Sequence, residues 1–159
     1  MKKIWTAGPS ISWIDKTKAM KVFFDTNVIL DILDNSREHH PESLYLLQAA
    51  GKGAIPACAT AQSIIDASYV RTQRDRVPVH VFKDGIDTLC RMISILGIEE
   101  EDIHQANLSL IQDYEDAAQL ACAERCGCDI LVTNDRKYRG YTSLPVYSVR
   151  EFYERLFLK

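Results

Sequence analysis

The chain has 159 residues, of which 47% are hydrophobic and 26% charged, and its formal net charge is -3. This balance fits one globular domain and excludes a disordered chain and a broadly basic protein that coats nucleic acid. No apolar run reaches the ~20 residues of a membrane span, and M-K-K-I-W-T-A-G-P-S lacks the apolar segment of a secretory signal. We therefore expect a cytoplasmic protein, with a poorly structured or cloning-derived lead over residues 1–19 and a single domain over residues 20–159.

Short apolar stretches bounded by turn residues are predicted to form strands over residues 21–25, 54–59, 92–96, 130–133 and 145–147. Helical patterns lie between them, over residues 28–33, 41–50, 60–73, 79–91, 103–110, 114–125 and 148–156. Alternating strands and helices indicate an α/β fold, in which helices cover both faces of a parallel sheet.

Several helix ends have recognisable signals. Thr26 and Asn27 offer side chains that cap the first helix. Gly127 is a helix stop, and Ser148 with Glu151 forms a capping box for the last helix.

Acidic residues follow the strands that are predicted at the centre of the sheet. Asp25 ends the first strand, in K-V-F-F-D-T-N-V-I-L-D-I-L, and Asp135 follows the fourth, in I-L-V-T-N-D-R. In open α/β sheets, ligands bind beyond the carboxyl ends of the strands, near the switch in strand order. These two acids meet if strands one and four are neighbours.

Further acids begin or interrupt helical patterns. Asp116 precedes an apolar stripe in D-Y-E-D-A-A-Q-L-A-C-A, Asp113 lies one turn before it, and Asp66 interrupts S-I-I-D-A-S-Y-V. Each acid also has an ordinary reading, as a helix cap, a partner of the helix dipole, a turn residue or part of a solvated face. A cluster of such acids is electrostatically unfavourable without cations, and carboxylates suit Mg²⁺ or Mn²⁺. These ions orient an attacking water and stabilise the leaving oxygen of a phosphodiester.

The five cysteines include the cluster C-A-E-R-C-G-C. Its spacing lacks the second pair of a zinc site, so core or surface thiols are the main interpretation and a metal or redox site is the alternative.

The chain resembles the PIN domain family. The resemblance rests on D-T-N-V-I-L-D-I-L, D-Y-E-D-A-A-Q-L-A-C-A, C-D-I-L-V-T-N-D and P-V-Y-S-V-R-E-F-Y-E-R-L, and it covers residues 20–159. It implies a three-layer α/β/α sandwich with a parallel sheet of about five strands in the order 3-2-1-4-5. It also implies a Mg²⁺- or Mn²⁺-dependent ribonuclease, the toxin of a toxin–antitoxin pair, with an antitoxin partner and a homodimeric state.

The resemblance also assigns the acids. Asp25, Asp116 and Asp135 match metal-binding acids of the family, and Asp113 is an additional metal ligand or supporting acid. Asp66 stands where the family usually has a glutamate, one methylene longer.

Two polar residues match family positions that orient the acids. Asn27 and Thr133 are expected to do so by hydrogen bonds.

Basic residues follow two of the predicted ligands. Arg71 and Arg74 come after Asp66, and Arg136 and Lys137 come directly after Asp135. Their positions favour contacts with RNA phosphates, and the alternative for each segment is an ordinary solvated loop. Nearby, Tyr138 and Tyr141 are candidates for stacking on unpaired bases.

Two other functions compete with the nuclease. A catalytically degenerate PIN fold would act as a nucleic-acid or protein binding module, and Asp66 in place of glutamate favours it. A magnesium phosphatase with an aspartyl nucleophile needs a second aspartate two residues after Asp25, where this chain has Asn27.

Overall fold

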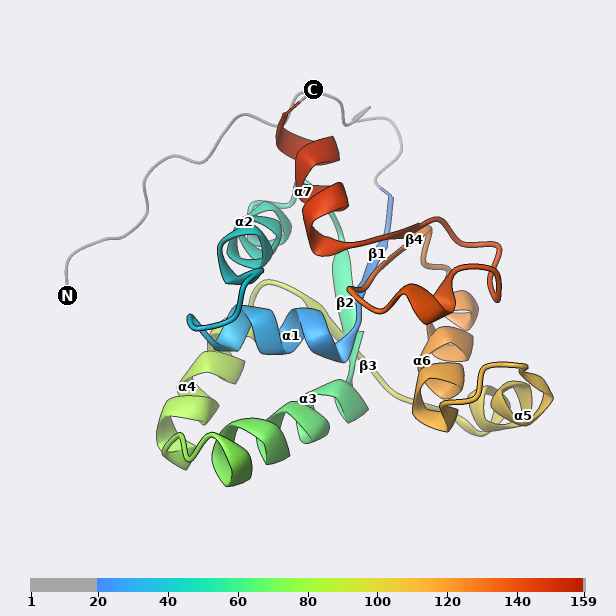
Figure 1. Cartoon of the computed structure of the whole chain (residues 1–159), viewed down its shortest axis with the longest axis horizontal. Helices are drawn as coiled ribbons and strands as arrows, with labels where there is room; N and C mark the ends of the chain where they lie inside the picture. Colours follow the sequence, from blue (N-terminus) through green and yellow to red (C-terminus); the bar gives the residue numbers. More distant parts are fainter. Residues whose placement is uncertain (1–19, 159) are drawn as a thin grey trace.

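A computed structural model describes residues 20–158, so the predicted lead lies outside the described residues (Figure 1). The sheet has five parallel strands, in the order β3-β2-β1-β4-β5. The strands are β1 (Val22–Phe24), β2 (Ala57–Thr60), β3 (Ser94–Leu96), β4 (Ile130–Val132) and β5 (Val146–Tyr147). This confirms the predicted PIN-like α/β sheet and its order 3-2-1-4-5.

The helices form layers on both sides of the sheet. They are α1 (Thr26–Leu33), α2 (His40–Gly51), α3 (Ala61–Ser68), α4 (Val79–Cys90), α5 (Glu100–Leu108), α6 (Tyr114–Arg125) and α7 (Val149–Phe157). A π-helical segment, η1 (Tyr69–Arg74), continues α3, and a short 3₁₀ helix, η2 (Arg136–Tyr138), follows β4. Figure 1 shows α5 and α6 on one side of the strands and the other α-helices on the opposite side.

The central strand β1 is buried on both faces, as its unbroken apolar sequence predicts. Val22 and Phe24 pack into the core beneath α1, α2 and α7, whereas Phe23 points into the second core, beneath α5 and α6. This alternation fixes the direction of every residue in β1, including Asp25 immediately after it.

The start of α1 differs from the sequence prediction. Its N-cap is Asp25, whose carboxylate accepts a hydrogen bond of 2.6 Å from the Thr26 backbone N–H, whereas Thr26 and Asn27 lie inside the first turn. The acid at the end of β1 therefore also begins the following helix.

Two other helix ends match the prediction. Gly127 has a φ of 68° just after α6, a left-handed conformation that favours glycine. The capping box of α7 is present, with reciprocal hydrogen bonds between Ser148 and Glu151.

An ion pair between the buried carboxylate of Asp102 and the more exposed guanidinium of Arg125 joins α5 to α6. Asp102, 1% exposed, accepts hydrogen bonds of 2.8 Å from both Nε and Nη2 of Arg125 and 2.8 Å from the Glu99 backbone N–H. Because α6 carries Asp116, this pair helps to fix the helix that presents a predicted site acid.

Asp102→Asn is therefore expected to lower the free energy of unfolding, because it weakens the hydrogen bonds that the buried carboxylate accepts from Arg125 and from the Glu99 N–H. Urea unfolding measures the change. The matched control is Glu99→Gln, which removes the charge of the exposed partner of the same arginine and should cost less stability than Asp102→Asn. Equal losses in the two variants would contradict this account.

Candidate active site

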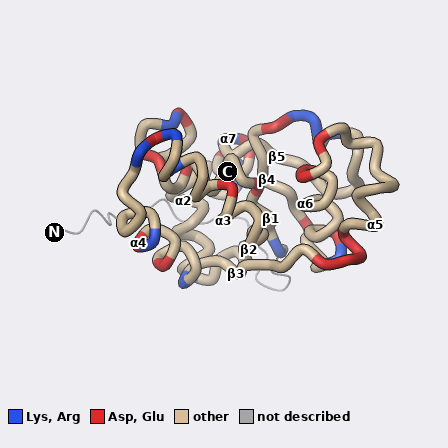
Figure 2. The backbone as a smooth tube through the Cα atoms, turned by 90° about the horizontal axis from the view of Figure 1, so that it is seen from below, with Lys and Arg blue, Asp and Glu red and all other residues tan. Residues whose placement is uncertain are grey.

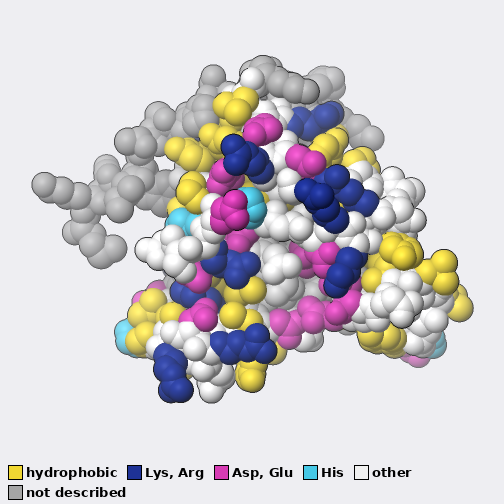
Figure 3. All heavy atoms as spheres, viewed as in Figure 1, with side chains coloured by type: hydrophobic (Ala, Val, Ile, Leu, Met, Phe, Trp, Pro, Cys, Tyr) yellow, Lys and Arg dark blue, Asp and Glu magenta, His cyan; other side chains and the backbone are white. Residues whose placement is uncertain are grey.

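The carboxyl edge of the sheet brings three predicted acids together. Strand β1 pairs with β4, with Phe24 opposite Val132, so Asp25 and Asp135 leave the sheet side by side. Asp116 reaches the same place from the first turn of α6, and the charges of Asp116 and Asp135 both raise the pKa of Asp25. Figure 3 shows acidic side chains gathered along the middle of this face, with basic side chains on either side.

Asp25 is the most deeply buried of the three, at 3% exposed. Burial is the main cause that raises its pKa to about 6, and the two neighbouring acids add to this rise. Hydrogen bonds from the Thr133 hydroxyl, at 2.7 Å, and the Thr26 N–H oppose it in part. At neutral pH this carboxylate is thus a buried negative charge without a cationic partner in the described chain.

Thr133 connects two of the acids. Its Oγ1 donates to Asp25 and accepts a hydrogen bond of 3.0 Å from the Asp135 backbone N–H. The Asp135 carboxylate accepts from the Lys137 backbone N–H at 2.9 Å and lies 3.7 Å from Lys137 Nζ. These hydrogen bonds are consistent with the supporting role predicted for Thr133. Within residues 20–158, Asn27 makes no hydrogen bond with any of these acids.

The Asp116 carboxylate is oriented by Tyr138, which was expected from the sequence to stack on RNA bases. The hydroxyl of Tyr138 donates to Asp116 Oδ1 at 2.8 Å, and the Tyr138 side chain is only 1% exposed. The expectation that Tyr138 stacks on RNA bases is wrong, because its ring fills the core beneath α6. Burial is the main cause that raises the pKa of Asp116, with additions from Asp113 and Asp135.

The other two predicted acids stand beside this group. Asp113 is the N-cap of α6 and accepts a hydrogen bond of 3.2 Å from the Asp116 backbone N–H. Asp66, on α3, accepts a hydrogen bond of 2.9 Å from Gln62 and faces a different acid, Glu115.

Sequence reasoning passed over Glu115, although it lies between two singled-out acids in D-Y-E-D. Partial burial is the main cause that raises its pKa to about 7, and the neighbouring carboxyl groups of Asp66, Asp113 and Asp116 add to this rise. A signal was available in Gln119, a polar residue in an apolar stripe, four positions after Glu115 and therefore on the same helix face.

The donor set suits a hard divalent cation. In residues 20–158, no group of three or more His, Cys, Asp or Glu side chains is already arranged to hold a metal ion. However, burial and the charges of neighbouring acids raise the pKa values of Asp25 and Asp116, and a cation between the carboxylates would offset this repulsion. Asp25, Asp116 and Asp135 are the residues that fit such an ion.

The predicted RNA-binding side chains differ in how exposed they are and in which residues they contact. The Arg71 side chain is 13% exposed and pairs with Asp34 at 2.9 Å and Asp75 at 2.7 Å, so it joins η1 to the end of α1. Arg74 lies over the Tyr69 ring, 5.6 Å from its centroid. Arg136 and Lys137 on η2 are exposed beside Asp135. Figure 2 shows these two basic segments on the same side of the molecule, with acidic positions between them.

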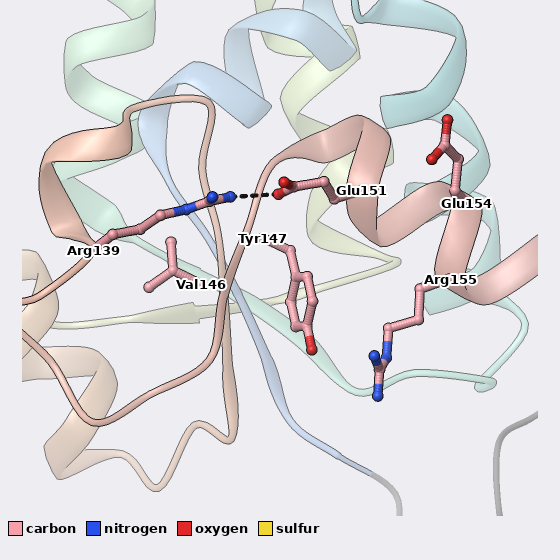
Figure 4. Close-up of a pocket in the computed structure, with 6 residues that line it drawn as sticks. All are labelled: Arg139, Val146, Tyr147, Glu151, Glu154 and Arg155. Atoms are coloured by element: carbon pink, nitrogen blue, oxygen red, sulfur yellow. Dashed lines mark hydrogen bonds and ion pairs between the residues drawn. The ribbon is translucent and has the colours of Figure 1, made fainter.

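Features away from this edge involve none of the predicted site acids. A hollow of about 450 Å³ lies over β5 and α7 and is lined by Arg139, Val146, Tyr147, Glu151, Glu154 and Arg155 (Figure 4). The Cys128 thiol lies 3.5 Å from that of Cys58 in the core, and the Cys122 thiol points at the Gly97 carbonyl. This arrangement agrees with core thiols, the main interpretation of the cysteine cluster.

None of the helices in residues 20–158 has the length and apolar character needed to cross a membrane.

Solved structures share this fold at low sequence identity. VapBC2 from Rickettsia felis, bound to a DNA fragment from its promoter, has a TM-score of 0.61 and 14% identity over 81% of this chain and 98% of that chain. PAE2754 from Pyrobaculum aerophilum has a TM-score of 0.61 and 16% identity over 92% and 97%. VapC20 from Mycobacterium tuberculosis, a sarcin-ricin loop cleaving toxin, has a TM-score of 0.59 and 12% identity over 78% and 98%.

Sequence comparison identifies the family of the chain as well as its fold. Ribonuclease VapC1 from Aquifex aeolicus (strain VF5) is 25% identical over 141 residues, which cover 85% of this chain and 94% of that protein. The family pattern of the PIN domain matches residues 21–137. This match covers most of the chain, which therefore belongs to the PIN domain family.

Proposed function

We propose that this protein is a divalent-metal-dependent endoribonuclease that hydrolyses RNA phosphodiester bonds, and that it acts as the toxin of a toxin–antitoxin pair. The observation that carries the proposal is the convergence of Asp25, Asp116 and Asp135 at one edge of a PIN-family sheet. The distant relationship to the ribonuclease VapC1 supports RNA as the substrate.

In this proposal, Asp25, Asp116 and Asp135 hold Mg²⁺ or Mn²⁺. When bound, the ion orients the attacking water and offsets negative charge at the phosphate. Thr133 keeps Asp25 and Asp135 in a fixed relation, and Tyr138 keeps one oxygen of Asp116 turned toward η2. These hydrogen bonds set the carboxylates in place before substrate arrives, which reduces the cost of ordering them later.

An acidic site repels the RNA backbone, so RNA binding needs positive charge nearby. Arg136 and Lys137 are best suited to this task, because both are exposed and next to Asp135. Arg71 and Arg74 are expected to contribute less, because the first is held by two carboxylates and the second by Tyr69.

An antitoxin and a second copy of the chain are the proposed protein partners. The VapBC2 structure and a toxin–antitoxin complex from Klebsiella pneumoniae, which has a TM-score of 0.59 and 18% identity, motivate the first. At these low sequence identities, similarity to such complexes supports only the fold of the toxin component. The proposal of an antitoxin partner therefore depends on the proposed nuclease function.

The competing function is a degenerate PIN fold that binds nucleic acid or protein without cleaving it. Its support is Asp66, which is one methylene shorter than the glutamate usual at this position and whose carboxylate accepts a hydrogen bond from Gln62. The two functions differ in whether divalent ions bind and whether RNA is cut.

Asp25→Asn and Asp116→Asn should each reduce Mg²⁺- or Mn²⁺-dependent cleavage of a mixed single-stranded RNA pool by at least about 100-fold, because each removes a charged ligand. Gel analysis of labelled RNA measures the loss, and EDTA should abolish cleavage by the unmodified protein. Asp87→Asn, at an exposed position of α4, is the control and should remain active. Full activity of Asp25→Asn would contradict the proposed mechanism, in which Asp25 is a metal ligand.

The burial of Asp25 also predicts a pH-dependent stability. Its pKa of about 6 lies above the ordinary value of 3.8, so the folded state binds the proton more tightly than the unfolded state. The contribution of Asp25 to the free energy of unfolding should therefore fall as pH rises from about 4 to about 6. In EDTA near pH 7, Asp25→Asn should be more stable than the unmodified protein by up to about 3 kcal/mol, and this advantage should shrink toward pH 4.

Urea unfolding at several pH values tests this expectation. A gain in stability that is the same at every pH would contradict a contribution from the ionised Asp25 carboxylate.

Loss of the exposed cations should weaken RNA binding without sequence preference. In an inactive Asp25→Asn background, Arg136→Ala with Lys137→Ala should lower the slope of log affinity against log salt concentration by up to about 1.4, which corresponds to two phosphate contacts. Fluorescence anisotropy with single-stranded RNA measures the slope. Arg91→Ala, at an exposed position after α4, is the control, and an equal effect there would exclude a specific role for η2.

A further inference from the structure

Asp31 is a buried acid that the proposed mechanism does not use. It lies in α1 between Leu30 and Ile32, which are also buried, and it is only 2% exposed. Its Oδ1 accepts a hydrogen bond of 2.5 Å from Arg37 Nε, and its Oδ2 accepts one of 2.9 Å from Asn134 Nδ2. Both carboxylate oxygens therefore have side-chain partners, and Asp31 joins α1 to the turn that follows β4.

The Asn134 amide has one favourable orientation. Its Nδ2 donates to Asp31, and its Oδ1 accepts a hydrogen bond of 3.1 Å from the backbone N–H of Val149, the first residue of α7. An ionised carboxylate can only accept and a backbone N–H can only donate, so a rotated amide would lose both hydrogen bonds. The N–H groups in the first turn of a helix have no partner within the helix, so Asn134 also supplies an acceptor that α7 needs.

Asn134 lies between two residues of the candidate site. The preceding residue, Thr133, donates to Asp25 at 2.7 Å, and the backbone N–H of the following residue, Asp135, donates to Thr133. Asn134 holds the same turn through α1 and α7. Two consecutive side chains therefore anchor this turn to different elements, and together they set the direction in which the chain leaves β4 toward Asp135.

A buried charge is an unfavourable way to join α1 to this turn. Apolar side chains of similar volume often stabilise a core as well as a buried ion pair does, and the other buried residues of α1 are apolar. A carboxylate, however, accepts hydrogen bonds in defined directions, whereas an apolar side chain sets no direction for its neighbour. The Arg37 guanidinium, 35% exposed, supplies the counter-charge of Asp31. The arrangement is therefore better explained by the orientation of Asn134 than by stability.

We propose that Asp31 and Asn134 are positioning residues of the nuclease site. They hold the turn after β4 in the conformation that brings Asp135 toward Asp25 and Asp116. The inference rests on the proposed metal-dependent function, in which Asp135 is a metal ligand. Neither Asp31 nor Asn134 touches the ion or RNA, and their effect on the ion passes through the backbone of the turn.

Mn²⁺ binding in the absence of RNA tests the effect on the ion. In Asp31→Asn, the new amide cannot accept hydrogen bonds from both Arg37 and Asn134. Isothermal titration should show that Asp31→Asn and Asn134→Ala each weaken Mn²⁺ binding by about 10-fold, because residues that orient metal ligands contribute to affinity on this scale. RNA cleavage by both variants should need more Mn²⁺, and kcat should recover most of its value at saturating Mn²⁺.

Hydrogen exchange measured by NMR in EDTA tests the positioning without metal. In Asn134→Ala, the Val149 N–H loses its acceptor, so its exchange should be about 10-fold faster. The Asp135 N–H should also exchange faster, because the turn is then held through Thr133 alone.

An exchange of the two residue types separates orientation from packing. In Asp31→Asn with Asn134→Asp, an amide in α1 can donate to a carboxylate in the turn, which can still accept from the Val149 N–H. Asn134→Asp alone adds the same acid but places it opposite the Asp31 carboxylate. The double variant should therefore bind Mn²⁺ more tightly than either single variant.

Asp129→Asn is the matched control at the opposite end of β4. The Asp129 carboxylate accepts a hydrogen bond of 2.9 Å from the backbone N–H of Lys21, which links the residue before β4 to the residue before β1. This variant should have a lower melting temperature, but its Mn²⁺ binding, RNA cleavage and Val149 exchange should be unchanged.

The outcomes separate this inference from the nuclease proposal. If the unmodified protein binds Mn²⁺ and cleaves RNA while Asn134→Ala binds Mn²⁺ equally tightly, the positioning role is overturned and the nuclease stands. An equal loss of Mn²⁺ affinity in Asp129→Asn would also overturn the positioning role, because the loss would then follow from general destabilisation. If the unmodified protein neither binds Mn²⁺ nor cleaves RNA, both proposals fall together.

Discussion

The Asp25 carboxylate is buried at the end of the central strand, and the free-energy cost of this burial is the main physical constraint on the candidate site. Asp25 is held by the Thr133 hydroxyl and by the first N–H of α1, but these neutral donors only partly offset its burial. Two more acids approach the same point and increase the repulsion. Within residues 20–158, no cationic side chain pairs with Asp25, and buried acids that lower stability in this way are common at functional sites.

Much of this arrangement was readable in the sequence. Unbroken apolar strands that alternate with helices indicate a parallel sheet, and acids that closely follow two of its strands then lie at its carboxyl edge. The order of strands came from the family resemblance, and the pairing of β1 with β4 agrees with it. The stop at Gly127 and the capping box of α7 were predictable because they depend only on neighbouring residues.

What the sequence did not reveal depends on contacts between distant segments. Whether Tyr138 faces RNA or the core depends on how η2 folds back over α6, and the hydrogen bond to Asp116 spans 22 positions. The partners of Gln119 come from α1 and α3, 93 and 56 positions away. Arg71 was predicted to contact RNA phosphates, but in the structure it pairs with Asp34 at the end of α1 and with Asp75 after η1. Side-chain type alone carries little information about such partners.

We propose that the acids at the carboxyl edge hold a divalent ion, and crystallography with Mn²⁺ shows whether they do. Anomalous diffraction from crystals grown with Mn²⁺ should show a peak coordinated by Asp25, Asp116 and Asp135. Absence of that peak at a Mn²⁺ concentration that supports RNA cleavage in solution would contradict the account, because the catalytic ion would then bind elsewhere.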